Sequence, residues 1–340
     1  MKVDTTLEGP LQAAAQEARR AEADGYDGIF TTEISHEPFF PLLLASEGTD
    51  GLTIGTGIAV AFARSPMTTA YAAWDLQTHS GGRFLLGLGS QIKPHVERRF
   101  SMPWGQPAAR MREYVSALKA IWASWQDGVP LAFEGEFYTH TLMTPFFTPA
   151  PLESAPPPVL IAAVGEGMTR VAGEVADGLL VHSFTTERYL RQVTTPVLTQ
   201  GLEQRGLARS DFQVVYPALA AVGRTDDELE RAIAGTRKQI AFYASTPAYK
   251  GILDVQGWGD LQPELHALSK RDRWEEMGTL VDDEVLTTFA AVGSPDEVAR
   301  QLLKRFDGVV DRIRLYQPYQ AEPEVALQVL AGIRDLDTER

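Results

Sequence analysis

Residues 82–104, GRFLLGLGSQIKPHVERRFSMPW, form the stretch that decides the fold. Bulky apolar residues at 84–86 are typical of a buried strand, and the strand ends in the small residues of 87–90. A polar and basic segment follows. A buried strand that ends in glycines and leads into polar residues is typical of the ligand-binding edge of an α/β protein. A glycine-weakened strand followed by a solvated amphipathic helix is the other interpretation.

Outside this stretch, the chain alternates apolar runs with helix-forming segments. The predicted strands are residues 2–6, 28–32, 52–60, 84–89, 158–163, 178–182, 212–222 and 310–316. Continuous apolar runs, nearly all followed by a helical pattern, are typical of parallel strands covered by helices. Eight such units favour a (β/α)8 TIM barrel of the α/β class over an open doubly wound sheet.

Two segments interrupt this alternation, residues 128–151 and residues 245–284. The first reads as a strand, a turn and a strand, and the second as helical in patches. No stretch rich in Gly, Ser and Pro divides the chain. The sequence therefore predicts one barrel domain over residues 1–340, with these two segments as insertions.

Composition excludes several classes of protein. The chain has 340 residues, 44% of them hydrophobic and 22% charged, which indicates a globular protein with a sizeable core. Its net charge of -14 argues against nucleic acid or an anionic membrane as a partner. The absence of cysteine excludes disulfides, thiolate catalysis and cysteine-based metal sites. No secretory signal and no apolar stretch of about 18 residues is present, so we expect a cytoplasmic protein without a membrane span.

Several common catalytic and cofactor-binding motifs are absent from the sequence. It contains no H-E-x-x-H metal motif, no G-x-S-x-G nucleophile elbow and no Walker A loop. Three glycine pairs, at residues 55 and 57, 87 and 89, and 165 and 167, lack the third glycine of G-x-G-x-x-G, because Val60, Ile92 and Arg170 stand there. The sequence predicts neither a metal site nor a Rossmann fingerprint, and chemistry is expected from another cofactor.

Several polar residues follow the predicted strands and are candidates for a site. Residues 165–169, GEGMT, join the fifth strand to a helix N-terminus, which favours a phosphate site over a turn that binds nothing. Glu33 and His36 follow the second strand, where each is either an acid or base or a structural residue. His182 follows the sixth strand and has the same two interpretations.

Four motifs together resemble the luciferase-like monooxygenases and, among them, the coenzyme F420-dependent oxidoreductases. They occur in the family's order, at residues 55–58, 82–100, 158–167 with 176–178 behind, and 293–298. The resemblance implies a barrel that binds F420, a deazaflavin that moves a hydride between its C5 and a substrate carbon. It also implies a cis peptide bond between Gly57 and Ile58 that backs the ring.

The resemblance assigns residues to the cofactor and to the substrate. The implied cofactor contacts are Gly57, Ile58, Ser90, Gln91, Val164, Gly165, Glu166, Gly167 and Met168. Glu33 and His36 stand where relatives keep substrate-handling polar residues, and would serve as acid or base. Gln91 and Ile92 replace the acid that F420-dependent glucose-6-phosphate dehydrogenases carry, so a sugar phosphate is not implied.

Three hypotheses of function follow. The first is an F420-dependent oxidoreductase acting on a small organic substrate bound under residues 33–41 and the second insertion. The second is an FMN-dependent monooxygenase that receives reduced flavin from a partner reductase. The third is a barrel that binds a flavin-like ligand without turnover. A homodimer is expected because relatives are often dimers.

Overall fold

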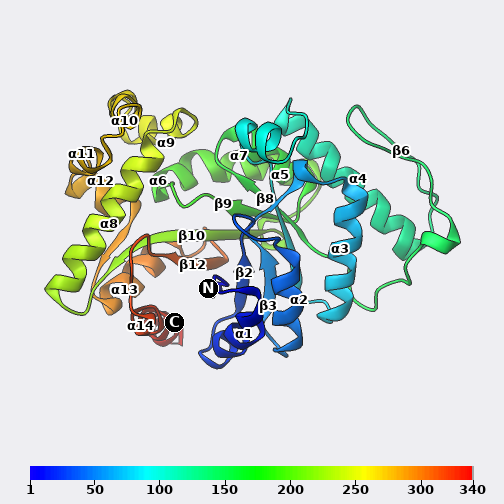
Figure 1. The fold of residues 1–340 in the computed structure, drawn as a ribbon, viewed down its shortest axis with the longest axis horizontal. Helices are drawn as coiled ribbons and strands as arrows, with labels where there is room; N and C mark the ends of the chain where they lie inside the picture. The colour runs from blue at the N-terminus through cyan, green and yellow to red at the C-terminus, as the bar shows by residue number, and fades with distance from the viewer. Residues whose placement is uncertain (339–340) are drawn as a thin grey trace.

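Eight parallel strands close into a barrel in the computed structural model, which describes residues 1–338 (Figure 1). The ring runs in the order β1 (Lys2–Thr6), β2 (Gly28–Thr31), β3 (Thr53–Thr56), β5 (Phe84–Gly89), β8 (Val159–Ala163), β9 (Gly178–Val181), β10 (Gln213–Val222) and β12 (Arg312–Tyr316). It closes where Lys2 of β1 pairs with Arg312 of β12. The predicted (β/α)8 barrel is confirmed, and each of its eight strands overlaps a predicted one.

Two further strands extend the ring. β4 (Ala59–Val60) continues the course of β3 and pairs with the end of β5. β11 (Ala291–Gly293) pairs with the end of β10. Both lie toward the carboxyl ends of the barrel strands, where a barrel of this kind binds its ligands.

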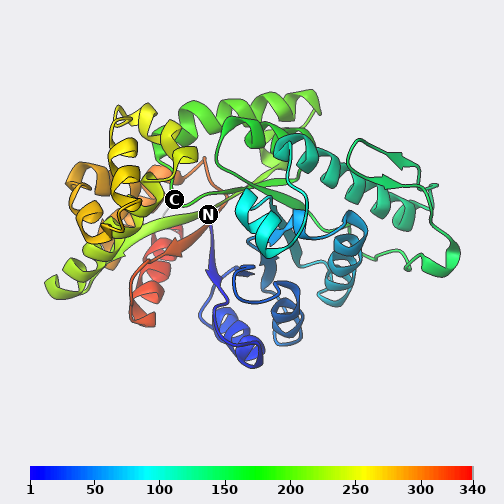
Figure 2. The same cartoon turned by 45° about the horizontal axis from the view of Figure 1, so that its top comes forward.

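Helices surround the ring on its outside (Figures 1 and 2). They are α1 (Ala14–Ala23), α2 (Phe39–Glu47), α3 (Pro66–His79), α4 (Pro107–Asp127), α5 (Glu166–Val175), α6 (Glu187–Tyr189), α7 (Thr195–Gln204), α13 (Pro295–Phe306) and α14 (Pro323–Thr338). The start of α13 illustrates how local sequence sets a boundary. The backbone N–H of Ser294 donates to Glu297 Oε2 at 2.9 Å, and Pro295 occupies the first helical position.

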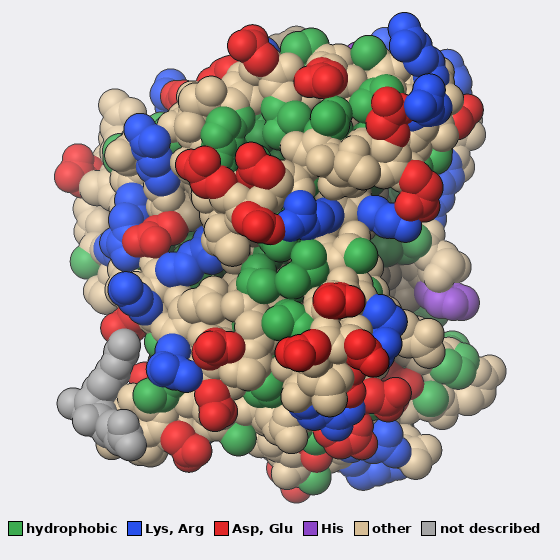
Figure 3. All heavy atoms as spheres, turned by 90° about the vertical axis from the view of Figure 1, so that its left-hand side faces the viewer, with side chains coloured by type: hydrophobic (Ala, Val, Ile, Leu, Met, Phe, Trp, Pro, Cys, Tyr) green, Lys and Arg blue, Asp and Glu red, His purple; other side chains and the backbone are tan. Residues whose placement is uncertain are grey.

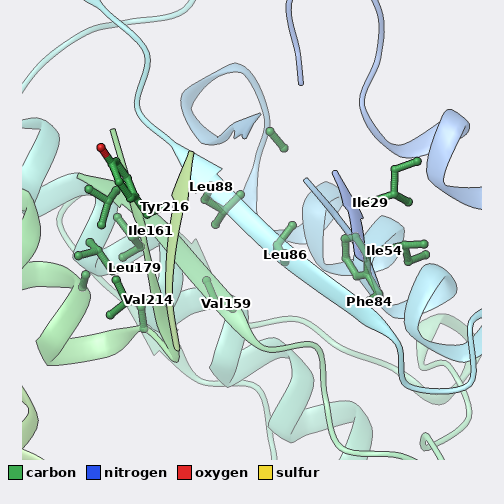
Figure 4. Packing of buried hydrophobic residues seen from close by; sticks show 14 of the residues in the cluster. Ile29, Ile54, Phe84, Leu86, Leu88, Val159, Ile161, Leu179, Val214 and Tyr216 are labelled. Carbon is green, nitrogen blue, oxygen red and sulfur yellow. The ribbon is translucent and has the colours of Figure 1, made fainter. Parts of the chain in front are cut away.

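The main core lies between the outer face of the strands and the helices (Figure 4). Successive side chains of a strand point to opposite faces, so on β5 Phe84, Leu86 and Leu88 enter this core while Leu85 points into the barrel. A smaller apolar cluster fills the barrel interior: Phe30, Leu85, Leu160, Leu180 and Val215. These side chains form a layer that fills the barrel beneath the carboxyl ends of its strands.

Gly87 permits close contact between β5 and β3 inside the ring. A Cβ atom at this position would overlap the carbonyl oxygen of Thr56. The Thr56 hydroxyl instead donates to the Gly87 carbonyl at 2.7 Å and accepts from the Gly87 N–H at 2.9 Å. The glycine that the sequence shows near the end of this strand is thus a packing requirement of the barrel.

Residues 128–151 form an arm that projects from the barrel beyond α4 (Figures 1 and 2). Within the arm, β6 (Phe133–Glu134) and β7 (Thr139–His140) pair antiparallel, so this segment contains the predicted strand, turn and strand.

The helices of residues 245–284 pack with α8 (Asp226–Ala244) and α12 (Asp283–Phe289) around a second apolar core. Within that segment the helices are α9 (Lys250–Gln256), α10 (Leu261–Ser269) and α11 (Trp274–Thr279). Acidic and basic side chains are interspersed over the outer face of this side of the molecule (Figure 3). One ion pair of these helices joins Lys238 and Glu275 at 2.8 Å. Among residues 1–338, no helix is long and apolar enough to cross a membrane.

Candidate functional site

The candidate site lies at the carboxyl ends of the barrel strands, which we call the rim. Three predicted segments reach the rim on adjacent strands. Gly57 and Ile58 lie between β3 and β4, residues 90 and 91 follow β5, and residues 164–168 follow β8. Because β3, β5 and β8 are neighbours in the ring, the fold brings these segments to one side of the rim.

The Gly57–Ile58 peptide bond is cis, and it separates β3 from β4. Backbone hydrogen bonds hold this bulge on its β2 side: the Gly57 N–H donates to the Thr31 carbonyl at 2.7 Å and the Glu33 N–H donates to the Ile58 carbonyl at 3.2 Å. The Ile58 side chain lies over Gly89, where a Cβ atom would be 2.8 Å from Ile58 Cδ1. Glycine at the end of β5 therefore makes room for an apolar side chain at the rim.

Glu33 binds the chain that follows this bulge through hydrogen bonds. Its Oε2 accepts from the Val60 N–H at 2.6 Å and from Arg64 Nη1 at 2.6 Å, and its Oε1 accepts from Arg64 Nη2 at 3.0 Å. Burial lowers the pKa of Arg64, but hydrogen bonding and the charge of Glu33 outweigh it and the net pKa is raised. Both oxygens of the buried carboxylate thus have donors, an arrangement that positions the backbone. The acid–base role of Glu33 stays a prediction.

His36 is exposed in the loop between β2 and α2. No hydrogen bond joins its ring to another part of residues 1–338. The structure therefore does not bring His36 and Glu33 together as a pair, and the role of His36 also stays a prediction.

Ser90 and Gln91 form the turn that leaves β5. Gln91 has a φ of 58°, in the left-handed region that non-glycine residues rarely occupy. Its Oε1 accepts from the Ile92 N–H at 3.2 Å, and the Ser90 hydroxyl donates to the Gln91 carbonyl at 3.1 Å. Backbone outliers of this kind cluster at ligand sites, which favours the predicted role of this turn.

The N-terminus of α5 has the features of an anion site. Gly165 is its N-cap and supplies no side chain to cap the helix, and the backbone N–H groups of residues 166–168 have no acceptor within residues 1–338. A Cβ atom at Gly165 or Gly167 would meet nothing within 4 Å. Open space in front of free amides, at the positive end of a helix dipole, fits a phosphate. The predicted segment thus fits the phosphate of a flavin or deazaflavin cofactor.

A polar cluster centred on His182 lies on the other side of the rim. The Phe184 N–H donates to His182 Nδ1 at 3.0 Å, so the neutral ring carries its proton on Nε2. That nitrogen is 3.2 Å from the hydroxyl of Tyr249, and Tyr243 O–H donates to Tyr316 Oη at 3.3 Å. Burial raises the pKa of Tyr249 to about 12, so this phenol keeps its proton at neutral pH.

The position of His182 after the sixth strand was visible in the sequence, but its partners were not. Tyr243 and Tyr249 come from the helices that follow β10, and both pack against the His182 ring, with ring centroids 4.9 and 4.8 Å away. The cluster therefore joins the barrel rim to the second core.

Burial of His182 predicts a loss of stability in acid. Burial lowers its pKa to about 4, from an ordinary value of 6.5. Below pH 6.5 the unfolded chain gains a proton at this ring while the folded chain does not, so stability is present above pH 6.5 and is lost as the pH falls toward 4. At pH 5 the loss from this group is about 2 kcal/mol. Urea unfolding at pH 7.5 and pH 5 measures this loss in the free energy of unfolding. In His182→Gln the difference between the two pH values should be smaller by about 2 kcal/mol. An equal dependence in both proteins would contradict the assignment.

No group of three or more His, Asp or Glu side chains within residues 1–338 is arranged to hold a metal ion. Fold and rim together define a (β/α)8 barrel with a candidate anion site after its fifth strand and an apolar bulge on its third.

The family model for luciferase-like monooxygenases matches residues 2–312, and the chain belongs to that family. An uncharacterized protein of Mycobacterium tuberculosis is 56% identical over 313 residues, 92% of each chain. A putative coenzyme F420-dependent oxidoreductase of the same species is 28% identical, over 86% of this chain and 87% of its own. The coenzyme F420-dependent tetrahydromethanopterin reductase of Methanopyrus kandleri has a similar structure, with a TM-score of 0.78 and 20% identity over 97% and 96% of the two chains.

Proposed function

We propose that this protein is an F420-dependent oxidoreductase that transfers a hydride between C5 of the deazaflavin and a small organic substrate. The start of α5 is the observation that carries the proposal, because its free amides and open glycine positions fit a phosphate-bearing cofactor. The relative described as F420-dependent favours the deazaflavin over FMN. When bound, F420 supplies the hydride chemistry, which no side chain of the rim can supply.

Residues of the rim have separate tasks in this proposal. Ile58 and the turn at Gln91 form an apolar and a polar wall for the ring, and the Glu33–Arg64 pair keeps the bulge in place. Hydride transfer to or from an oxygen-bearing carbon also requires proton movement. The Tyr249 hydroxyl, which accepts from His182, retains its own proton for donation and adds a candidate to Glu33 and His36.

Titration of the protein with F420 and with FMN, followed by cofactor fluorescence, tests the proposal. We expect F420 emission to change on binding, with a lower Kd for F420 than for FMN. Binding of FMN with no change in F420 emission would reject the F420 assignment.

The second candidate is a flavin-dependent monooxygenase, which the description of the matching family supports. It predicts oxygen consumption when the protein receives chemically reduced FMN and its substrate. The third candidate is a barrel that binds the cofactor without turnover. Detection of hydride exchange between bound F420 and any substrate would exclude it.

A further inference from the structure

Arg314 is a half-buried cation on the face of β12 that points into the barrel. It lies on β12 two residues after Arg312, on the same inward face, since the intervening Ile313 enters the outer core. No hydrogen bond or salt bridge joins its guanidinium to any other residue of 1–338. Its one specific contact is the ring of Phe30, whose centroid is 5.8 Å from the guanidinium carbon.

The nearby acids do not neutralise this cation. Asp4 is fully buried and both of its oxygens accept from Arg312, at 2.6 and 2.9 Å. Glu8 is exposed and makes no salt bridge with Arg314. Burial lowers the pKa of Arg314, and the charges of Asp4 and Glu8 only partly offset this. The side chain is half-buried, so part of its desolvation is uncompensated until a ligand accepts from its unused donors.

Arg314 reaches from β12 across the interior to the bulge on the opposite wall. Its Nη1 lies 3.6 Å from the point where a Cβ atom of Gly57 would stand, and Phe30 lies beside both groups. The guanidinium therefore borders the surface that the cofactor ring occupies in the proposed function. Five donors in a rigid fork suit a planar, acceptor-rich edge.

We propose that Arg314 binds the carbonyl edge of the deazaflavin or flavin ring and stabilises the negative charge that this edge carries after two-electron reduction. The site would then bind the reduced cofactor more tightly than the oxidised one. This inference rests on the proposed function. On reduction a substrate carbon would supply one hydride to the ring, and the Arg314 guanidinium would bind the N1–C2 carbonyl segment over which the added electron pair is spread.

Binding of the two redox forms tests this role without any substrate. Oxidised and chemically reduced F420, and in a second series FMN, are titrated anaerobically into the wild-type protein, Arg314→Met and Arg314→Lys. We expect Arg314→Met to weaken binding of the reduced form at least about tenfold more than the oxidised form. The midpoint potential of the bound cofactor then falls by about 30 mV, the shift that a tenfold change produces in a two-electron couple. Arg314→Lys keeps the charge and should retain part of the difference.

The free protein supplies a second readout. Arg314 is half-buried, and its removal relieves the partial desolvation of a charge that makes no ion pair within residues 1–338, so Arg314→Met should keep or raise the melting temperature of the free protein. A marked fall would indicate a structural role and overturn the inference. If Arg314→Met weakened binding of both redox forms equally, or of neither, this inference would be overturned while the proposed function would stand. Failure of the wild-type protein to bind F420 or FMN would overturn the proposed function and this inference together.

Discussion

Replacing Arg312 with methionine is expected to lower the free energy of unfolding by about 3–5 kcal/mol, because it leaves the Asp4 carboxylate buried without its partner. Asp4 and Arg312 are 1% and 2% exposed, and two hydrogen bonds join them. Gly28 accommodates the pair, since a Cβ atom there would lie 2.6 Å from Arg312 Nη2. The ion pair thus ties β12 to β1 where the barrel closes.

The pH dependence of this loss has a definite sign. Burial already raises the pKa of Asp4, and the charge of Arg312 opposes that rise. Without Arg312 the pKa rises further, so the carboxyl becomes neutral more readily in the folded chain. The loss should therefore be largest at pH 7 and shrink as the pH falls toward the ordinary value of an aspartate.

Denaturant unfolding of Arg312→Met at pH 7 and pH 5 measures both effects. The control is the double variant Asp4→Val with Arg312→Met, which should recover much of the stability because no buried charge remains. A single variant as stable as the wild-type protein would contradict the role given to this pair.

Replacing Gly165 with aspartate is expected to weaken binding of F420, or of FMN, at least about 100-fold, equivalent to about 2.7 kcal/mol. The new side chain finds open space, and the backbone at φ -93° and ψ 165° suits any residue. Its carboxylate would cap α5, occupy the amides that would hold the phosphate and repel the phosphate charge. The free protein should gain a few tenths of a kcal/mol from the better cap.

Gly165→Asn is the matched control, because asparagine caps a helix as well as aspartate but carries no charge. Cofactor titration of the two variants separates the repulsion between carboxylate and phosphate from competition for the backbone amides. We expect a smaller loss of affinity for asparagine than for aspartate. Wild-type affinity in Gly165→Asp would place the phosphate elsewhere.

Much of the fold could be predicted from local patterns. The predicted strand at residues 84–89 matches β5 residue for residue, and α4 begins with a proline and is followed by Gly128. A continuous apolar run, a Pro at the first helical position and a glycine after the last turn each act within a few residues, so they can be read directly. Residues 165–169 could be recognised as a candidate phosphate site for the same reason, since their glycines and the start of α5 are adjacent in sequence.

Side-chain partners could not be predicted in this way. Glu33 was expected to act on substrate, yet its oxygens accept from Val60 and Arg64, 27 and 31 residues away. The importance of His182 likewise depends on Tyr249, which stands 67 residues further along the chain. These pairings arise from how loops fold back on the rim, and no local pattern specifies them.

The sequence by itself determined the barrel, its strands and the glycine-lined positions of the rim, because hydrophobic periodicity and backbone geometry are local. Only the tertiary structure decided the roles of the two arginines of β12. In the sequence RIRLY of β12, Arg312 and Arg314 lie on the same face of the strand, and nothing in the sequence distinguishes their roles. Ring closure brings Asp4, 308 residues away, against the first of them and leaves the second beside the bulge, where no residue of 1–338 forms a salt bridge with it. The pairing of a buried charge depends on long-range geometry, because only an acid within a few ångströms can compensate its desolvation.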